Sequence, residues 1–497
     1  MSQESYEIYF KEKYKMKRFL SCVLLISMLA SLSACGSEAQ GGETTVGEQT
    51  TAAETSPDNI PLGTNLNGAT VKIYVRGDTI DSEFDNQETG DVVDDAIHNR
   101  NRTIEERLNV KLEYISNTSE SYWDDRNIYM DTVRAAVLAN DGSIDIAAGL
   151  SNIMPYLAQD GMFINLMRSD IPYLNFDSPW WPAELTDELS VNGRLYMASG
   201  EACLGVIKGM MCFYFNKNIV ENNNLENPYD LVTSGKWTLD KMAEMASSVY
   251  SDLNGNAKVD IEDQFGFYIS SVNHAPNFVL ASGMRLTTND ADGLPEYDLG
   301  SERIINLIDK LNTIMVNDAM LADTGDESGE KCFTDGRCLF MTGEFGFAES
   351  FRELPFDYGI LPYPKYDETQ EDYISSSRAT YSLFGILMTA NAENCAAVLE
   401  ALASENYRTV TPAYYEKALK VKYSRDDISS QMFDLIKGHI SFDYGIVHGP
   451  MMGNISTYLR EEISYHRGTW SSTWAAQKDA VKATNDKYLE DIMSLPE

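Results

Sequence analysis

The stretch Val71-Lys72-Ile73-Tyr74-Val75 opens the segment that decides the fold, residues 71–148. Apolar residues in this segment recur with the period of two typical of strands and the period of 3.6 typical of helices. They predict strands over 71–75, 110–114 and 144–148, separated by helices over 91–108 and 129–139. A βαβαβ order of this kind forms a parallel sheet, and parallel sheets bind ligands at the carboxyl ends of their strands.

The rest of the chain continues the α/β pattern. Thr238 and Lys241 mark a helix start, with the threonine as the N-cap residue. Further strands are predicted over 204–216, 338–342, 358–362 and 383–388, and further helices over 238–250, 301–320 and 392–403.

Composition excludes several functional classes. The 497 residues include 43% hydrophobic and 23% charged residues, which is typical of a folded globular protein of two to four domains. Asp and Glu number 76 against 39 Lys and Arg, and the resulting net charge of −37 repels nucleic-acid phosphates. The five His are too far apart for an HExxH zinc motif. We therefore expect neither nucleic-acid binding nor zinc hydrolysis.

The N-terminus predicts export and anchoring. A basic stretch ending at Arg18 precedes an apolar run from Phe19 to Ala34, which is too short to span a bilayer and suits a signal peptide. Small residues before Cys35 resemble the lipobox of bacterial lipoproteins, which predicts a signal peptide over 1–34 and lipidation of Cys35. An ordinary secretory signal with a coincidental cysteine is the alternative.

Residues 35–65 are predicted to form a flexible linker, because Gly, Ser, Thr and Glu dominate up to Asn59 and bury little apolar surface. Five cysteines follow the linker, so at least one has no disulfide partner. Cys332 and Cys338 flank a turn-like segment where a disulfide is one option and free thiols are the other.

Several segments together resemble extracellular solute-binding proteins of carbohydrate ABC transporters, the family 1 type. They occur in that family's order across residues 66 to 450: Asp145-Ile146-Ala147-Ala148-Gly149, residues 157–166, Asn192-Gly193-Arg194-Leu195-Tyr196, residues 213–217, Gly235-Lys236-Trp237-Thr238, residues 335–341 and residues 359–365. Each segment alone is a weak signal, and the ordered set is a specific one.

The resemblance implies an α/β, two-lobed periplasmic-binding-protein-like fold with a hinge and a ligand cleft between the lobes. Lobe I is expected over 66–176 plus about 376–415, and lobe II over 177–375 plus about 416–497. The implied function is non-enzymatic: a lipid-anchored protein on the extracellular face of the cell membrane captures a carbohydrate, an oligosaccharide above all. It then delivers the carbohydrate to the permease subunits of an ABC importer. A monomer is the family default.

Candidate ligand residues follow from strand ends, aromatic platforms and family position. Carbohydrate sites combine aromatic faces with Asn, Asp, Glu and Arg side chains. Trp180 and Trp181 could instead pack at the hinge, Arg76 could be an ordinary surface residue, and Trp123 could belong to either kind of environment. The predicted ligand-binding residues are Arg76, Asn152, Trp180, Trp181, Glu201, Phe345, Arg378 and Tyr381.

A twelve-residue loop, Asp252 to Asp263, has the ligand spacing of an EF-hand and predicts structural Ca²⁺. Ala257 stands where a glycine makes the sharp turn, and Asp263 replaces the usual Glu. A solvated Asx-turn loop is the alternative. The predicted ligands are Asp252, Asn254, Asn256, Lys258 through its carbonyl, Asp260 and Asp263.

Two other functional classes remain open from the sequence. A secreted glycan-processing hydrolase would use two carboxylates about 5 to 10 Å apart, and no local motif singles out such a pair. A binding protein for a peptide, a sugar acid or another small solute is the third possibility. The negative net charge disfavours an anionic ligand unless Arg76 or Arg378 compensates it locally.

Overall fold

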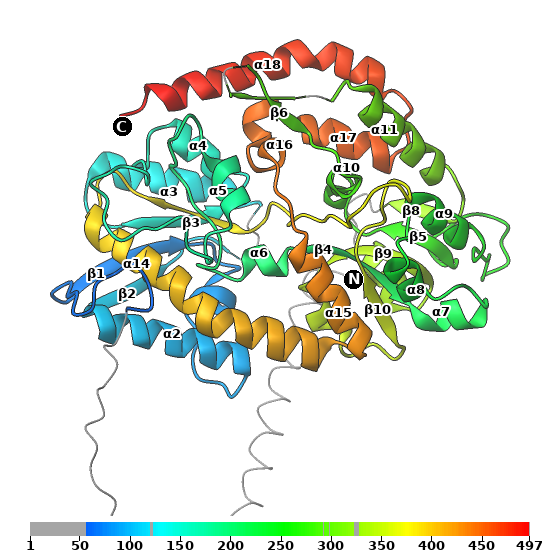
Figure 1. Ribbon diagram of the computed structural model, residues 1–497, viewed down its shortest axis with the longest axis horizontal. Helices are drawn as coiled ribbons and strands as arrows, with labels where there is room; N and C mark the ends of the chain where they lie inside the picture. Colours follow the sequence, from blue (N-terminus) through cyan, green and yellow to red (C-terminus); the bar gives the residue numbers. More distant parts are fainter. Residues whose placement is uncertain (1–55, 120–122, 292, 298, 323–327, 497) are drawn as a thin grey trace, which may run out of the picture. The chain divides into compact units, whose positions relative to one another are not determined.

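The computed structural model describes residues 56–119, 123–291, 293–297, 299–322 and 328–496, and residues 55–497 belong to one unit (Figure 1). The predicted signal peptide, Cys35 and the linker up to residue 55 lie outside the described residues. Two separate sheets organise the described part of the chain, and we call the regions around them the first and the second lobe.

The first lobe is built on a four-stranded sheet of order β11-β3-β1-β2. The central strand β1 pairs in parallel with β2 and with β3, and β11 runs antiparallel to β3. The predicted βαβαβ unit is confirmed, and Ile73 lies opposite both Tyr114 and Ile146. The strands are β1 (Ala69–Val75), β2 (Val110–Ile115), β3 (Ile146–Leu150) and β11 (Ser382–Ile386).

Helices cover this sheet. Asp91 caps the longest of them, α2, by accepting a hydrogen bond from Val93 N, and Asn109 ends it in the left-handed conformation. The helical segments of the first lobe are η1 (Ile80–Phe84), α2 (Val92–Leu108), α3 (Arg126–Ala139), α4 (Met154–Gln159), α5 (Ala183–Leu189), α14 (Ala392–Glu405) and η3 (Asn406–Val410).

The second lobe is built on a five-stranded sheet of order β10-β4-β9-β5-β8. Its core is aromatic: the Phe213 and Phe267 rings stack with centroids 5.3 Å apart, and Trp237 and Phe340 are fully buried beside them. The strands are β4 (Met211–Asn216), β5 (Phe265–Ile269), β8 (Met320–Ala322), β9 (Cys338–Glu344) and β10 (Tyr358–Leu361), and a separate hairpin pairs β6 (Thr287–Asn289) with β7 (Pro295–Tyr297).

Thr238 caps α9 as the sequence predicts, by accepting a hydrogen bond from Lys241 N. The remaining helical segments are α6 (Gly205–Lys208), α7 (Lys217–Asn222), α8 (Pro228–Thr233), α9 (Leu239–Ser247), η2 (Val272–His274), α10 (Asn277–Ala281), α11 (Glu302–Met315), α12 (Ser328–Thr334), α13 (Phe347–Phe351), η4 (Ala413–Tyr423), α15 (Asp427–Gly438), α16 (Tyr444–Val447), η5 (Gly449–Met452), α17 (Ile455–Ser464) and α18 (Trp470–Ser494).

The C-terminal helix α18 packs on both lobes (Figure 1). Its Trp470 and Val481 are buried in the second core, and Tyr488 and Ile492 are buried in the first. No helix in the described ranges is both long enough and apolar enough to cross a membrane.

Several described chain segments cross between the lobes, including the helical run from α14 through η4 (Ala413–Tyr423), whose Tyr414 and Leu419 pack in a cluster with Tyr214 and Tyr358 of the second sheet. Two other crossings are paired. The segment 198–210 leaves a bridge between Ala198 and Phe384 in the first lobe and enters β4. The segment 376–381 begins at Ser376, whose carbonyl accepts a hydrogen bond from Met211 N, and continues into β11. These paired crossings form the hinge region.

The predicted strand over 204–216 is wrong in its first part, which belongs to the first crossing. The chain forms the short helix α6 before β4, and the α6 glycine packs against the second crossing. A Cβ on Gly205 would lie 3.1 Å from Tyr381 Cα, and one on Gly209 would lie 2.8 Å from Ser377 Oγ. Close packing of the two crossings therefore replaces an extended strand here.

The structure also corrects two smaller expectations and decides between two options for a third. Residues 56–65 of the predicted linker pack on the first lobe, where Ile60 is buried and Asp58 pairs with Arg107 at 2.6 Å. The predicted helix over 301–320 ends at Met315. Of the two options for Cys332 and Cys338, the structure shows free thiols.

Packing places residues 180–206 with the first lobe. Trp180, Trp181 and the segment from Leu185 to Cys203 belong to its core, although the predicted lobe boundary lies at residue 176. Burial of this apolar segment in the first core moves the lobe transition to the crossing at 198–210.

Candidate functional site

A cavity of about 810 Å³ lies between the lobes. It falls in the upper part of the roughly 300 to 1,000 Å³ range of small-molecule sites, which favours a ligand larger than one sugar ring. Its described lining residues are Trp123, Arg126, Asn127, Met130, Asn152, Ile153 and Tyr156 from the first lobe, Met211, Val272, Asn273, Pro276 and Asn277 from the second, Ser376, Arg378, Ala379 and Thr380 from a crossing segment, and Ile446, Gly449, Pro450, Asn454, Ser456, Thr457 and Arg460 from the C-terminal part.

The first-lobe wall carries two aromatic rings. Trp123, just before α3, exposes 51% of its surface, and the Arg126 guanidinium lies 4.3 Å from the centre of its ring. This cation–π contact fixes the indole while leaving area for a ligand. Tyr156 comes from α4, which follows the carboxyl end of β3. An exposed tryptophan and a tyrosine provide the apolar faces on which sugar rings stack.

Amide side chains supply hydrogen-bonding groups around the cavity. Asn277 is only 1% exposed, and Ser376 Oγ donates a hydrogen bond to its Oδ1 atom at 2.6 Å. Its Nδ2 atom has no hydrogen-bond partner among the described residues, and neither has the buried Oδ1 atom of Asn152. An amide donor and an amide acceptor are thus left for a ligand.

A buried polar network supports Arg378. Its Nη1 atom donates to Glu344 Oε1 at 2.7 Å, and His274 Nε2 lies 3.0 Å from the same oxygen. Burial lowers the pKa of His274, so the imidazole is neutral at pH 7 and donates from Nε2. Burial opposes ionisation of Glu344, but the Arg378 charge and the His274 hydrogen bond outweigh it and lower the pKa of Glu344.

The structure brings two of the eight predicted ligand residues to the cavity lining, Asn152 and Arg378. Arg76 lies behind the lining, where its Nη1 atom donates to the carbonyl of the cavity residue Thr380 at 2.6 Å. The topology explains why these three residues lie at or near the cavity. Arg76 and Asn152 both follow the carboxyl ends of parallel strands, and Arg378 lies in a segment that crosses between the lobes.

The other five predicted residues lie away from the lining. Trp180 and Trp181 pack in the first core, and Trp181 Nε1 donates to Glu400 at 3.0 Å. Phe345 is fully buried against Phe433, with ring centroids 4.7 Å apart. Their contacts make these aromatic residues parts of the hydrophobic packing rather than exposed platforms.

Glu201 and Tyr381 are also engaged by the protein. The Glu201 carboxylate accepts a hydrogen bond from the Thr411 hydroxyl, and burial raises the pKa of Glu201. The Tyr381 side chain lies in the first core, and its carbonyl accepts a hydrogen bond from Ser151 N at 3.0 Å. The sequence did not predict Asn277 and Arg460, which distant segments bring to the cavity. Trp123 could have been predicted as a ligand residue, because it is a tryptophan in a polar loop.

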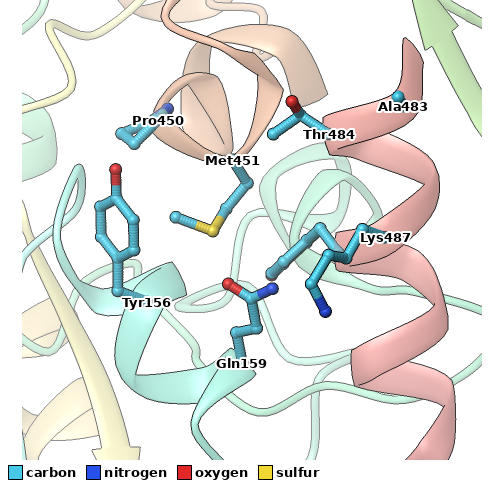
Figure 2. Close-up of a pocket in the computed structure, with 8 residues that line it drawn as sticks. Tyr156, Gln159, Pro450, Met451, Ala483, Thr484 and Lys487 are labelled. Atoms are coloured by element: carbon cyan, nitrogen blue, oxygen red, sulfur yellow. The ribbon is translucent and has the colours of Figure 1, made fainter. Parts of the chain in front are cut away.

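A smaller pocket of about 280 Å³ lies beside the cavity, between α4, η5 and α18 (Figure 2). Tyr156 and Pro450 line both spaces. The smaller pocket is more apolar in its residues, which include Met451 and Ala483, and it is less suited to a hydroxyl-rich ligand.

The loop 252–263 adopts a sharp turn despite lacking the expected glycine. Ala257 has a φ of 59°, in the left-handed region, and Asp252 accepts hydrogen bonds from Gly255 N and Ala257 N at 2.7 and 2.8 Å. Asp263 is fully buried, with its Oδ2 atom bonded to the Tyr250 hydroxyl at 2.9 Å. Its Oδ1 atom has no partner in the described part of the chain. That orphaned carboxylate oxygen fits a hard cation.

The asparagine side chains of the loop are not oriented as calcium ligands in this structure. The Nδ2 atoms of Asn254 and Asn256 donate to Asp260 at 3.2 and 2.5 Å, so both amides would have to turn their oxygens toward a cation. Within the described ranges, no three His, Cys, Asp or Glu side chains gather as metal ligands. Calcium binding stays a prediction.

Comparison with known proteins supports the fold. No family model and no curated protein matches the sequence. Solved structures that do match include a sugar transporter from Rhizobium etli in an open conformation, with a TM-score of 0.55, 13% identity, and coverage of 86% of this chain and 100% of that one.

Two further matches have names that state a carbohydrate ligand. One is the cyclic alpha-maltosyl-1,6-maltose binding protein from Arthrobacter globiformis (TM-score 0.54, 12% identity, 86% of this chain and 99% of that one). The other is the maltose-binding periplasmic protein from Listeria monocytogenes in complex with maltose (TM-score 0.53, 11% identity, 86% and 99%). The chain therefore has the two-lobed α/β fold of periplasmic-type solute-binding proteins.

Proposed function

We propose that this protein is a carbohydrate-binding component of an ABC importer: it captures an oligosaccharide between its lobes and delivers it to permease subunits. The observation that carries the proposal is the 810 Å³ cavity, which combines Trp123, Tyr156 and five asparagines between two lobes and a crossing segment. Aromatic faces and amides are what a hydroxyl-rich ligand with apolar C–H faces requires. The solved sugar-binding proteins of the same fold support this proposal.

A binding role is favoured over hydrolysis by the chemistry of the lining. Glycosidases place two carboxylates on either side of the scissile bond. The described lining residues include three arginines and five asparagines but no Asp or Glu. Glu344, the carboxylate behind Arg378, is held by two partners and has a lowered pKa, which is unsuited to a general acid.

The proposal includes the cellular location. The sequence of residues 1–35 supports a lipoprotein signal and lipidation of Cys35, which would hold a monomeric receptor on the extracellular face of the membrane. Mass spectrometry of the membrane-bound protein tests this part, with a Cys35 that carries a diacylglyceryl group as the expected N-terminal residue. A mature N-terminus at another residue, or a Cys35 without lipid, contradicts it.

Calorimetry of the full chain with mono- and oligosaccharides tests the binding function, with chromatography of each mixture for new products. Saturable binding of an unchanged oligosaccharide is expected. Trp123→Ala should weaken that binding by about 2 kcal/mol, roughly 30-fold, without lowering the melting temperature, because the indole is half exposed. Tyr465→Ala removes a comparably exposed aromatic residue outside the cavity and serves as the control. Cleavage of the glycan would instead identify a hydrolase.

We also propose that the loop 252–263 binds structural Ca²⁺. The support is the ligand spacing, the left-handed turn at Ala257 and the unpartnered oxygen of buried Asp263. Chelator-treated protein should gain melting temperature at millimolar Ca²⁺, and Asp252→Asn should remove most of the gain. Asp367→Asn, in an exposed Asx turn outside the loop, should keep it. Absence of both heat and stabilisation with Ca²⁺ contradicts the site.

A further inference from the structure

The charge of the cavity differs from the charge of the whole protein. The chain carries −37, yet the described lining of the cavity contains Arg126, Arg378 and Arg460 and no carboxylate. Salt screens surface charges beyond a Debye length of about 8 Å, so a distant acidic surface does little to a partly enclosed site. The local field in the cavity is therefore set by the arginines.

Arg378 contributes little to this field, because Glu344 neutralises it at 2.7 Å. Arg126 is placed over the Trp123 ring and donates to the Trp123 carbonyl, a neutral acceptor. The described residues place no carboxylate within ion-pair distance of Arg126. The positive charge of Arg126 therefore lies next to the Trp123 ring on which a sugar could stack.

Arg460, from α17, is the least compensated of the three. Its Nη1 atom donates to the Asn273 amide oxygen at 2.6 Å, which fixes the guanidinium without cancelling its charge. Its Nε atom is buried and has no hydrogen-bond partner among the described residues, and no described carboxylate forms an ion pair with it. The neighbouring acids are engaged elsewhere: Glu461 pairs with Arg467, and Glu462 accepts from Asn312 and Thr469.

A partly buried guanidinium without a counter-charge is unfavourable unless a ligand provides one. Neutral sugars donate many hydroxyl hydrogens, and carboxylates are their strongest acceptors, but the described lining offers none. A negatively charged group on the ligand supplies the counter-charge that Arg126 and Arg460 lack among the described residues. The planar guanidinium matches a carboxylate or a sulfate group through two parallel hydrogen bonds.

We propose that the cavity selects an acidic carbohydrate, and that Arg460 binds its carboxylate or sulfate group. This inference rests on the proposed function, since it names the substrate class of the same cavity. The ligand's sugar rings lie against Trp123 and Tyr156, and its charged group lies toward Arg460 of the C-terminal part.

Calorimetry with matched oligosaccharides tests the inference on the full chain. The probes are galacturonate and glucuronate oligomers with their carboxyl-reduced counterparts, and sulfated oligosaccharides with their desulfated counterparts. We expect one acidic series to bind, with loss of its charge lowering the affinity at least about 30-fold. The series that binds identifies the charged group as carboxylate or sulfate.

Arg460→Gln should reproduce that loss and flatten the dependence of affinity on NaCl concentration. Arg467→Gln, seven residues along the same segment and paired with Glu461 outside the cavity, should leave affinity unchanged. Arg460→Lys keeps the charge and should retain part of the affinity, which separates charge recognition from a folding effect.

The possible outcomes are distinct. Binding of neutral oligosaccharides alone, or equal binding of both members of each pair, overturns the acidic-ligand inference and leaves the carbohydrate-binding function standing. Binding of an acidic series that Arg460→Gln does not weaken overturns the assignment of Arg460. Failure of every oligosaccharide to bind overturns both the inference and the proposed function.

Discussion

The Arg378 Nη1 atom lies 2.7 Å from Glu344 Oε1, and this ion pair joins a hinge crossing to the end of β9. His274 donates to the same oxygen, and Thr342 Oγ1, which accepts from Ser270 N, is left to donate to His274 Nδ1 at 3.0 Å. The network positions the Arg378 guanidinium at the cavity wall, so its loss should affect both stability and binding.

Glu344→Gln should lower the free energy of unfolding by about 1 to 3 kcal/mol, because it leaves a mostly buried guanidinium without its counter-charge. Urea denaturation followed by tryptophan fluorescence measures the change. Glu353→Gln breaks an exposed pair with Arg352 and should change stability by less than about 0.5 kcal/mol. Equal effects of the two substitutions would contradict the assigned role of Glu344.

The first sheet was the most predictable part of the molecule. Val71, Ile73 and Val75 recur with the period of two typical of a strand, and the helices between the predicted strands require parallel crossovers. Because ligands bind at the carboxyl ends of parallel strands, Asn152 after the third strand was correctly predicted to line the cavity. Local periodicity and topology were sufficient there, because both follow from residues close together in sequence.

The aromatic candidates show why the remainder could not be predicted. Trp181 and Phe345 are chemically suited to sugar stacking, but α14 and α15 bury them, and only the three-dimensional arrangement reveals this. Asn277 and Arg460 carry no local motif and reach the cavity because segments about 180 residues apart meet there. The type of a side chain shows which interactions it can make with a ligand. Tertiary packing decides which side chains of that type line the cavity.

His448 should make stability depend on pH. Its ring stacks on Tyr444 with centroids 4.2 Å apart, and burial lowers the pKa of His448 from 6.5 to about 4. Between these values the unfolded state binds a proton that the folded state excludes, so stability falls as pH decreases from 6.5 to 4. The full loss from this residue is about 3 kcal/mol.

Comparison of wild type with His448→Gln isolates this effect, because Gln can still donate to the Glu188 carbonyl that His448 contacts. Wild type should lose about 2 to 3 kcal/mol more than the variant between pH 7 and pH 4.5, measured by urea denaturation. Burial raises the pKa of Glu188 to about 7, which acts in the opposite direction in both proteins and cancels in the difference. Parallel pH curves would show that His448 does not titrate as a buried group.

Gly266 in β5 permits the close approach of α9. A Cβ at this position would lie 1.9 Å from the main-chain oxygen of Ala246. Gly266→Ala should therefore force the helix from the sheet and destabilise the protein by at least about 3 kcal/mol. Gly438→Ala, at the end of α15 where a Cβ meets nothing within 4 Å, should be neutral or stabilising by about 0.5 kcal/mol. Thermal unfolding that ranks the two variants otherwise contradicts this packing.

Arg194 secures the C-terminal end of α18 to the first lobe. Its Nη1 atom donates to the carbonyls of Met493 at 2.6 Å and Leu495 at 2.9 Å, where a helix end leaves acceptors unsatisfied. Nearby, Gln159 donates to Asp491 at 2.7 Å, beside the pocket formed by α4 and α18 (Figure 2). Since the start of α18 is buried in the second core, these contacts connect the two lobes through one helix.

Arg194→Ala should fray the last turn of α18 while leaving its start folded. Hydrogen–deuterium exchange should show faster exchange over residues 488–495 and unchanged protection around Trp470, with a loss of about 1 to 2 kcal/mol in global stability. Lys482→Ala removes an exposed i,i+4 pair with Asp486 in the middle of the same helix and should change neither readout. Uniform loss of protection along α18 would mean that the helix detaches as a whole, so that its attachment to the second lobe depends on Arg194 as well.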